Sequence, residues 1–456
     1  MFIRRNGLIR TVTSVVLCSV LIASFAGCGN TSSSGGTQTT ASTDASVSTD
    51  SVSTDTEKKE PITLTFSTFN NWGTAQNAVS IGISLYEKGT GNKVEQQLYP
   101  DDQFMNVIKT KLATGDVPDF IATYASRKGN VPLDLLEPLD GEEWITQIRP
   151  GLDSFCTRES DGKWVVAPVG ALSYLGAIYN KDVFKKAGVS LPLKNYEDLL
   201  AACEAIQKIG VAPIQPANKD NAAFIWDLIG DHYLYEKNPD IAKNIAANKL
   251  NPSESPEINA AYQRIVDLKK YFKSDYASAT GMDGLKQVAN GEVAMFANGS
   301  WCYGILSKDY ADKMPSLGIM PISLGDDYQA VTRTGPQNGF AIPKKSKHIN
   351  EAKEFIKYVM TPVVAGAVAE VAPGTYPLNV DTRKSSWDSE MEGYVEQGLP
   401  TKNQTMDEYF GSFDVGPGFQ DSVQTMLLGK PIKSALNEEW YKKMADLNKS
   451  KRTPGW

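Results

Sequence analysis

Hydrophobic and polar residues alternate between the strand period and the helix period from residue 62 onward. ITLTFSTF (62–69) alternates apolar and polar side chains as a half-buried strand does, and AVSIGISLYEKG (78–89) places its apolar residues at helical spacing. KVEQQLYP (93–100) and PDFIATY (118–124) predict two further strands, with a helix between them. Strands that alternate with helices are typical of a mostly parallel sheet covered by helices, which binds ligands at the carboxyl ends of its strands.

Capping residues predict where the first two helices begin and end. Gly89 is the expected C-terminal stop of the first helix, because glycine adopts the left-handed conformation that ends helices. Asp101 or Asp102 is the expected N-cap of the second helix, and Gly115 is its expected stop.

A second α/β unit is predicted where the alternation restarts. VVAPVG (165–170) and YLGAIYN (174–180) have the apolar character of strands. The helical segment NYEDLLAACEAIQKIG begins at an expected N-cap, Asn195, and ends at an expected stop, Gly210. Ser255, followed directly by proline, opens another predicted helix in the order that helix starts favour.

The N-terminal segment differs from this body. Three arginines precede the apolar run TVTSVVLCSVLIASFAGC, which is too short for a stable transmembrane anchor. The run ends in Ala-Gly directly before Cys28 and so resembles the lipobox of bacterial lipoproteins, although Phe25 stands where leucine is usual. Residues 1–27 are therefore expected to be a signal peptide and Cys28 the lipidated first residue after cleavage. The alternative is an ordinary signal peptide followed by an incidental cysteine.

A polar tether is predicted between Cys28 and the body. Residues 29–56 contain little apolar surface beyond scattered Ala and Val, so they cannot offset the entropy of ordering. Residues 28–60 are therefore expected to form a lipidated, flexible leash. Such a leash would hold the body close to the extracellular face of the cytoplasmic membrane.

Composition excludes several functional classes. The body, with most of the chain's 8 Trp and 19 Tyr, is large enough for two domains. Removal of the signal takes away three arginines and no acids, so the formal charge falls from −7 to about −10, which argues against nucleic acid. Cys156, Cys203 and Cys302 have no disulfide or metal spacing, and His232 and His348 are too few for a histidine-rich metal site. We expect no metal and no cofactor.

Five stretches of the body resemble, in the same order, the family 1 extracellular solute-binding proteins, which are maltose-binding-protein-like sugar receptors of ABC importers. The stretches are KLATGDVPDFIATYA, DGKWVVAPVG, AIYNKDVFKKAGVSLPLKNYEDLLAACEAIQKIGVAPI, NGEVAMFANGSW and GFAIPKKSKHINEAKEFIKYVM. The resemblance implies an α/β, two-lobed periplasmic-binding-protein-like fold of type II. Each lobe would be a mostly parallel sheet flanked by helices, and a hinge would let the lobes close on a ligand.

The resemblance also implies where the chain passes between the lobes. The first crossing is expected near residues 168–172 and another near residues 335–339. The implied lobes are residues 61–168 plus about 338–383 for lobe 1, and residues 169–337 plus about 384–456 for lobe 2.

A sugar offers an apolar ring face and a rim of hydroxyls, so its site needs aromatic planes and convergent polar groups. Trp301 follows the strand EVAMFA and the turn Asn-Gly-Ser, where the resemblance implies stacking on the sugar; core packing is the alternative. Asn70, Asn71 and Trp72 follow the first strand at its carboxyl end and would supply amide hydrogen bonds and a second aromatic wall. Their alternative role is a capped helix start.

Further candidates follow the third strand and the first crossing. Tyr124, Ser126 and Arg127 stand after PDFIAT, where an arginine can bind a hydroxyl pair or an acidic sugar; a surface salt bridge is its alternative role. The resemblance implies contacts from Ser173 and Tyr174, just past the crossing.

The resemblance also implies ligand contacts from two later segments. NKDNAAFIWD (218–227) places Asn221, Phe224 and Trp226 in a loop at the edge of the cleft, although both aromatic residues suit the core equally well. The Asp414 carboxylate would accept two hydroxyl bonds from a sugar, or it would cap a helix instead.

These patterns predict a lipid-anchored extracellular substrate-binding protein of an ABC transporter. It would act as a monomer without chemistry of its own, capturing a sugar or oligosaccharide by closure of two lobes and delivering it to a membrane permease. One alternative is a secreted carbohydrate-active hydrolase with two carboxylates roughly 5 to 10 Å apart, which a chain with 53 acids does not exclude. The other is a polysaccharide-binding surface protein, for which repeats are expected and none is seen.

Overall fold

The structure, a computed structural model, describes residues 60–456 apart from short gaps. In the described part, no helix is both long enough and apolar enough to cross a membrane. The segments outside the described part are 1–59, 70–73, 126–130, 221–233, 236, 327–329, 335, 337, 372–375, 379–384, 404–409, 411–412, 414, 416–417 and 451.

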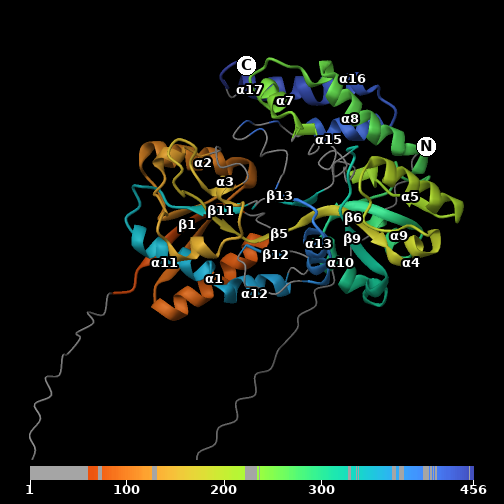
Figure 1. Ribbon diagram of the computed structural model, residues 1–456. Coiled ribbons are helices and arrows are strands. Elements are labelled where there is room, and N and C mark those ends of the chain that lie inside the picture. Colours follow the sequence, from red (N-terminus) through yellow and green to blue (C-terminus); the bar gives the residue numbers. More distant parts are fainter. Residues whose placement is uncertain are drawn as a thin grey trace, which may run out of the picture. The chain divides into compact units, whose positions relative to one another are not determined.

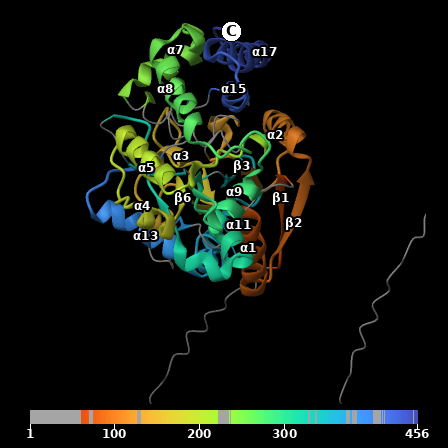
Figure 2. The same ribbon diagram turned by 90° about the vertical axis from the view of Figure 1, so that its right-hand side faces the viewer.

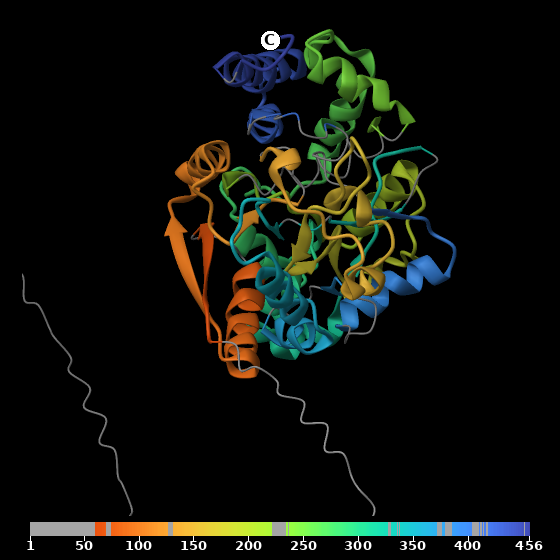
Figure 3. The same cartoon turned by 90° about the vertical axis from the view of Figure 1, so that its left-hand side faces the viewer.

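The first sheet contains five strands of the described chain in the order β2-β1-β3-β11-β4. β1, β2 and β3 are the three strands that the alternation predicts, and β1 runs parallel to both of its neighbours. Figure 3 shows β1 and β2 side by side in orange, and β2 is the edge strand. The bounds are β1 (Thr63–Phe69), β2 (Lys93–Tyr99), β3 (Phe120–Thr123), β11 (Asn338–Ala341) and β4 (Ala167–Val169).

Helices cover both faces of the first sheet because its strands place aromatic side chains alternately on either face. Phe120 lies against Phe355 of α11 (Ile349–Val359), with ring centroids 4.7 Å apart. On the opposite face, Phe69 lies 5.0 Å from Phe104 of α2 (Asp101–Thr114). Figure 1 shows α11 with α1 (Thr74–Thr90) and α12 (Pro362–Val371) below the strands and α2 above them.

The second sheet contains six strands of the described chain in the order β13-β10-β6-β8-β7, with β9 also paired to β6. Its central strand β6 (Tyr174–Asn180) is buried along its whole length. The other strands are β13 (Thr401–Asn403), β10 (Val331–Arg333), β8 (Val293–Gly299), β7 (Ala212–Ile214) and β9 (Leu317–Met320). The helices packed on this sheet include α5 (Tyr196–Lys208) on β7, α9 (Gly281–Ala289) on β8 and α13 (Ser386–Glu396) on β9 and β10.

Among the described strands, each sheet is parallel except for one reversed strand. β11 runs antiparallel to β3 and β4, and β6 runs antiparallel to β8, β9 and β10. Both reversed strands are the ones at which the chain arrives directly from the other sheet, without a helix crossover. The predicted α/β fold with two flanked, mostly parallel sheets is confirmed.

The described chain passes between the sheets at two places, and a third passage falls within residues 379–384, which lie outside the described residues. It leaves the first sheet after Val169 and joins the second at Tyr174, and it returns between Arg333 and Asn338. The third passage lies between Leu378, whose carbonyl accepts a hydrogen bond from the Arg149 amide, and the start of α13. VVAPVG therefore contributes β4 to the first sheet rather than opening the second unit. A two-stranded sheet of β5 (Ala171–Leu172) and β12 (Tyr376–Pro377) accompanies the first passage.

Late helices of the chain form a group with two earlier ones. α15 (Gly418–Leu427) and α16 (Ile432–Ala435) both contact α8 (Pro256–Asp267), and the π-helical turn η8 (Leu436–Tyr441) continues α16 into α17 (Lys442–Ser450). Trp440 is fully buried within this group. Figures 1 and 2 both show α15 and α17 in blue beside α8 and α7 (Pro239–Ala246) in green.

Several predicted caps are confirmed and two are wrong. Asn195 accepts from the Asp198 amide at 2.9 Å, and Ser255 accepts from the Ile258 amide at 3.2 Å, as expected of N-caps. The second helix begins at Asp101 itself, with Pro100 at the N-cap position and no side-chain cap.

The predicted stop at Gly89 is also wrong. The first helix continues to Thr90, and Gly91 follows it with a φ of 80°. The other two expected stops, Gly115 and Gly210, do follow their helices with positive φ.

Candidate functional site

The carboxyl ends of the parallel strands of the first sheet carry one predicted site residue, Tyr124, beside a phenylalanine. Phe69 ends β1 opposite Tyr99, and Tyr124 follows β3 directly. The half-buried Tyr124 ring lies 5.0 Å from the Phe69 ring, tilted by 36°, so the phenylalanine supports one side of the tyrosine. The structure therefore places Tyr124 at the sheet edge that α/β proteins use for ligands.

Trp301 stands at the corresponding edge of the second sheet. β8 ends at Gly299, Ser300 makes the turn, and Trp301 occupies the N-cap position of α10 (Cys302–Asp309). The tryptophan is 38% exposed, which is unusual for the largest apolar side chain. Its indole lies directly on Gly299, because a Cβ built there would be only 2.0 Å from the indole Cζ3. One part of the ring is thus held against the strand end while the rest is open.

Ser300 links the Trp301 turn to the first passage between the sheets. Its hydroxyl accepts a hydrogen bond from the Tyr174 amide at 3.0 Å, and its own amide donates to the Tyr174 carbonyl at 2.9 Å. Ser300 is fully buried, so this exchange is shielded from water. The structure therefore brings Trp301 and Tyr174, two predicted ligand contacts, to adjacent positions of one sheet edge.

Ser173 is a further predicted contact at this edge, and it joins two of the passages. Its amide donates to the Thr334 hydroxyl at 3.0 Å, and its carbonyl accepts from the Thr334 amide at 2.7 Å. Ser173 is only 6% exposed. These backbone hydrogen bonds hold the first two passages together where they meet the second sheet.

Tyr174 presents no exposed surface in this structure. Its hydroxyl donates to Glu392 of α13, and the guanidinium of Arg333 lies 5.7 Å from its ring centroid. Arg333 in turn donates to Glu392 at 2.7 Å. Burial raises the pKa of the Tyr174 phenol far above its ordinary value, and the Glu392 carboxylate raises it further, so the hydroxyl stays protonated as a donor. Direct contact of Tyr174 with a ligand would require rearrangement, and it stays a prediction.

The loop after β7 is fixed by buried amides that sequence analysis did not single out. The fully buried Gln215 donates to Asp275 at 2.8 Å and to Gln287 at 2.7 Å. Asn218 donates to the Gln424 carbonyl at 3.2 Å, and the Gln424 side chain donates back to the Asn218 carbonyl at 2.8 Å. The two bonds between Asn218 and Gln424 hold α15 to the segment that precedes the predicted loop contacts.

The remaining predicted site residues lie outside the described residues, so their roles stay predictions. They are Asn70, Asn71, Trp72, Ser126, Arg127, Asn221, Phe224, Trp226 and Asp414, together with the predicted lipidation residue Cys28.

A small apolar hollow lies where the first passage meets helices α1 and α12. Its lining includes Pro168, Val169, Val364 and Leu378, and its volume of about 20 Å³ holds roughly one water molecule. It is too small for a sugar and offers no side-chain hydroxyl or carboxylate. It is therefore not the ligand site.

The sequence matches known proteins over much of its length. The family model of bacterial extracellular solute-binding proteins matches residues 83–390. An uncharacterized ABC transporter extracellular-binding protein of Pyrococcus horikoshii is 27% identical over 271 residues, which are 57% of this chain and 58% of that protein. The melibiose/raffinose/stachyose-binding protein MelE of Bacillus subtilis is 24% identical over 294 residues, 60% of this chain and 64% of that protein. The alignments thus span less than two thirds of these relatives.

Solved structures share the fold over most of their length. The bacterial solute receptor AcbH has a TM-score of 0.66 at 18% identity, covering 85% of this chain and 99% of that chain. RafE in complex with raffinose has a TM-score of 0.63 at 18% identity, covering 84% of this chain and 99% of that chain. At such identities the likeness concerns the fold alone.

Proposed function

This chain belongs to the family of bacterial extracellular solute-binding proteins, and from that premise we propose that it captures a soluble sugar or oligosaccharide for an ABC importer. The observation that carries the proposal is the partly exposed indole of Trp301, which follows the carboxyl end of β8, where α/β sheets commonly bind ligands. An open aromatic plane suits the apolar face of a pyranose ring. The binding of melibiose, raffinose and stachyose named for MelE supports a carbohydrate as the ligand class.

Binding would proceed by closure of two lobes about the three passages between the sheets. Lobe 1 would comprise residues 61–168 plus about 338–383, and lobe 2 residues 169–337 plus about 384–456. Trp301 and Tyr124 would then approach the ligand from different lobes, because they stand on different sheets. A ligand shifts such an equilibrium only by binding the closed form more tightly than the open form.

The protein would act without chemistry of its own, at the extracellular face of the cytoplasmic membrane. The lipobox-like sequence before Cys28 and the polar residues 29–56 support a lipid anchor with a leash. An anchored monomer that can reach a membrane permease would deliver its sugar there.

A panel of mono- and oligosaccharides tests the proposal by thermal shift and intrinsic fluorescence. A bound sugar at a hundred times its Kd stabilises the folded protein by about 2.7 kcal/mol, which a thermal shift detects. The expected result is a rise in Tm with at least one sugar and no change in that sugar after incubation. Cleavage of the oligosaccharide would instead indicate the hydrolase, and binding only to insoluble polymer would indicate a surface adhesin.

Replacing the indole tests the site itself. Trp301→Ala is expected to weaken binding of the best sugar about tenfold to a hundredfold, since lost stacking and apolar burial amount to roughly 1.5–3 kcal/mol. Leu428→Ala removes another exposed apolar side chain, in the chain segment after α15, and serves as the control. An unchanged Kd in Trp301→Ala would show that the ligand does not stack there.

A further inference from the structure

The first two passages between the sheets meet the second sheet at one largely buried network, to which the helix after the third passage also contributes. Tyr174 is the first residue of β6, directly after the first passage, and Arg333 is the last residue of β10, directly before the second. Glu392 lies on α13, the helix that follows the third passage. Each of the first two passages is therefore attached, at its end on the second sheet, to a strand that contributes one side chain to the network.

The side chains of this network contact one another directly. The Glu392 carboxylate accepts from both the Tyr174 hydroxyl and the Arg333 guanidinium, the latter at 2.7 Å. The guanidinium also lies 5.7 Å from the tyrosine ring centroid. Residues Arg333 and Tyr174 are paired across β10 and β6, so the side-chain contacts reinforce a backbone pairing.

Burial makes these contacts strong constraints. Tyr174 is fully buried, and the side chains of Arg333 and Glu392 are 14% and 17% exposed. Removing one partner of a buried ion pair is strongly destabilising, because the other charge is then left buried without a compensating charge. The three elements are thus held in a defined relation at the point where the passages begin.

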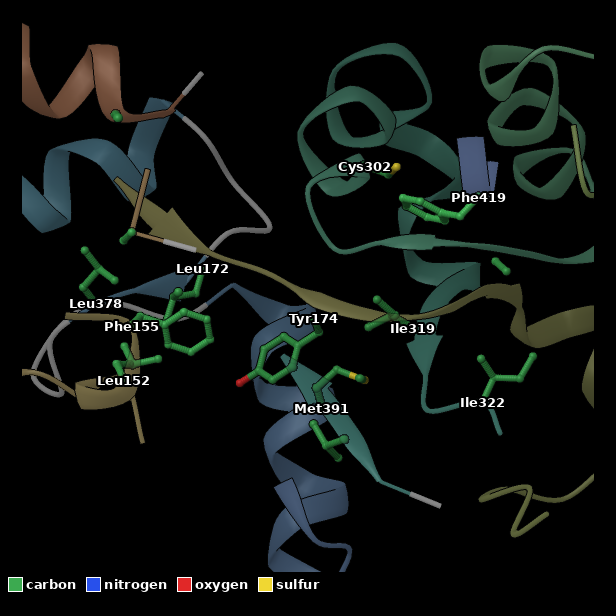
Figure 4. Packing of buried hydrophobic residues seen from close by; sticks show 14 of the residues in the cluster. Leu152, Phe155, Leu172, Tyr174, Cys302, Ile319, Ile322, Leu378, Met391 and Phe419 are labelled. Carbon is green, nitrogen blue, oxygen red and sulfur yellow. The ribbon is translucent and has the colours of Figure 1, made fainter. Parts of the chain in front are cut away.

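Two side chains at the end of the first passage pack on different parts of the molecule, although they are only two residues apart. Figure 4 shows Leu172 on the side of Phe155 and Leu378, whereas the ring of Tyr174 lies beside Met391 of α13 in this view. Leu378 belongs to the segment that accompanies the first sheet, whereas α13 packs on the second. Motion of one sheet relative to the other would therefore have to be absorbed next to Tyr174.

We propose that Tyr174, Arg333 and Glu392 are positioning residues that fix the ends of the first two passages against α13 and so set the affinity for the ligand without touching it. The proposal rests on the proposed function, namely binding by closure about these passages. If the network is loosened, the passages sample more orientations in the open protein. The protein then loses more conformational entropy when it closes, so the ligand binds more weakly.

The same strand and helix contain a matched network near the other end of β6, away from the first two passages. Tyr179 of β6 donates to Glu390 of α13 at 2.8 Å, and Lys181 contacts Glu390 at 3.3 Å. Tyr179 is 5% exposed, so its burial is close to that of Tyr174. The variants Tyr174→Phe and Glu392→Gln can therefore be compared with Tyr179→Phe and Glu390→Gln, which make the same chemical changes in the same two elements.

The first experiment needs no ligand. Hydrogen exchange is measured by mass spectrometry on peptides covering residues 171–174 and 331–334 in the full chain. Exchange in both peptides is expected to accelerate several-fold in Tyr174→Phe and Glu392→Gln, and to stay unchanged in Tyr179→Phe and Glu390→Gln. Equal exchange in all four variants, whether fast or slow, would overturn the proposal.

The second experiment measures Kd for every sugar that binds the wild-type protein. Tyr174→Phe and Glu392→Gln are each expected to raise Kd about 5- to 20-fold, by the same factor for each sugar, and together no more than either alone. A factor that differs between sugars would show direct contact and refute a positioning role. If the wild-type protein binds no sugar, the proposed function fails, while the exchange comparison still decides whether the network fixes the passages.

Discussion

At the scale of single residues, the contact between Gly299 and Trp301 decides how the indole is presented. Gly299→Ala is expected to displace the ring, because the new methyl group would overlap the indole at 2.0 Å. Since a side chain can swing away, the free energy of unfolding should change by less than about 1 kcal/mol. Sugar affinity should fall as far as in Trp301→Ala, and the double variant should lose nothing more.

Isothermal titration of the three variants checks this prediction. Gly393→Ala in α13 is the control, because a Cβ there meets no atom within 4 Å. Wild-type affinity in Gly299→Ala would show that the indole orientation is unimportant for binding.

The Arg158–Asp161 pair predicts a dependence of stability on pH. Hydrogen bonds from Arg158 lower the pKa of Asp161 from 3.8 to about 2, so the pair stabilises the folded state fully above pH 4 and loses this effect as pH falls toward 2. Asp161→Asn should therefore lower the urea midpoint at pH 7 and have little effect near pH 2. Asp116→Asn, at an 88% exposed side chain 3.6 Å from Lys111, is the control. A deficit of equal size at both pH values would contradict the prediction.

Sequence analysis predicts that both Trp301 and Tyr174 contact the ligand, but only Trp301 is exposed to solvent. The partner that buries Tyr174, Glu392, stands 218 residues later in the chain. No local pattern indicates such a contact, because it depends on how α13 packs on the second sheet. Arg333 and Gln424 were missed for the same reason.

At the scale of elements, local signals predict most helix starts and most helix stops, and the failures have tertiary or local reasons. Asn195 and Ser255 were predictable because an N-cap bonds to its own helix three residues on. Gly89 does not end its helix. A glycine stands there because a side chain would not fit: a Cβ would lie 2.4 Å from the Tyr358 hydroxyl oxygen. That reason is tertiary, so sequence spacing does not reveal it.

Two asparagine caps give a prediction that separates capping from burial. Asn180 accepts from the Val183 amide at 3.1 Å and also donates to the Val288 carbonyl at 3.0 Å, whereas Asn195 caps only its own helix. Asn180→Ala should therefore cost about 2–3 kcal/mol of the free energy of unfolding, and Asn195→Ala about 1 kcal/mol. Urea unfolding compares the two variants, and equal losses would show that the buried bond to Val288 contributes nothing.

At the scale of the whole molecule, the alternation of strands and helices predicted two α/β units correctly. It could not predict which strands are reversed. β6 and β11 run against their neighbours because the chain reaches them directly from the other sheet, and that path is a property of the whole topology.

The predicted anchor also belongs to this scale. Cys28→Ala should move the protein from the membrane fraction to the soluble fraction of expressing cells, because the cysteine is the proposed lipid attachment site. Cys18→Ala, within the apolar run, is the matched control and should leave the protein with the membrane. Fractionation with palmitate labelling measures both. Membrane retention of Cys28→Ala would contradict lipidation at this residue.

The native thiols of the described chain have a practical consequence. Cys156, Cys203 and Cys302 are all buried, and burial raises the pKa of the Cys302 thiol to about 12, so these sulfurs react slowly with maleimides. In a fragment that begins after the tether, one cysteine could be introduced into an outer helix of each sheet. These two cysteines would then react with nearly all of the two maleimide fluorophores. Energy transfer between the dyes would then report domain motion in single molecules without any deletion of the protein's own cysteines.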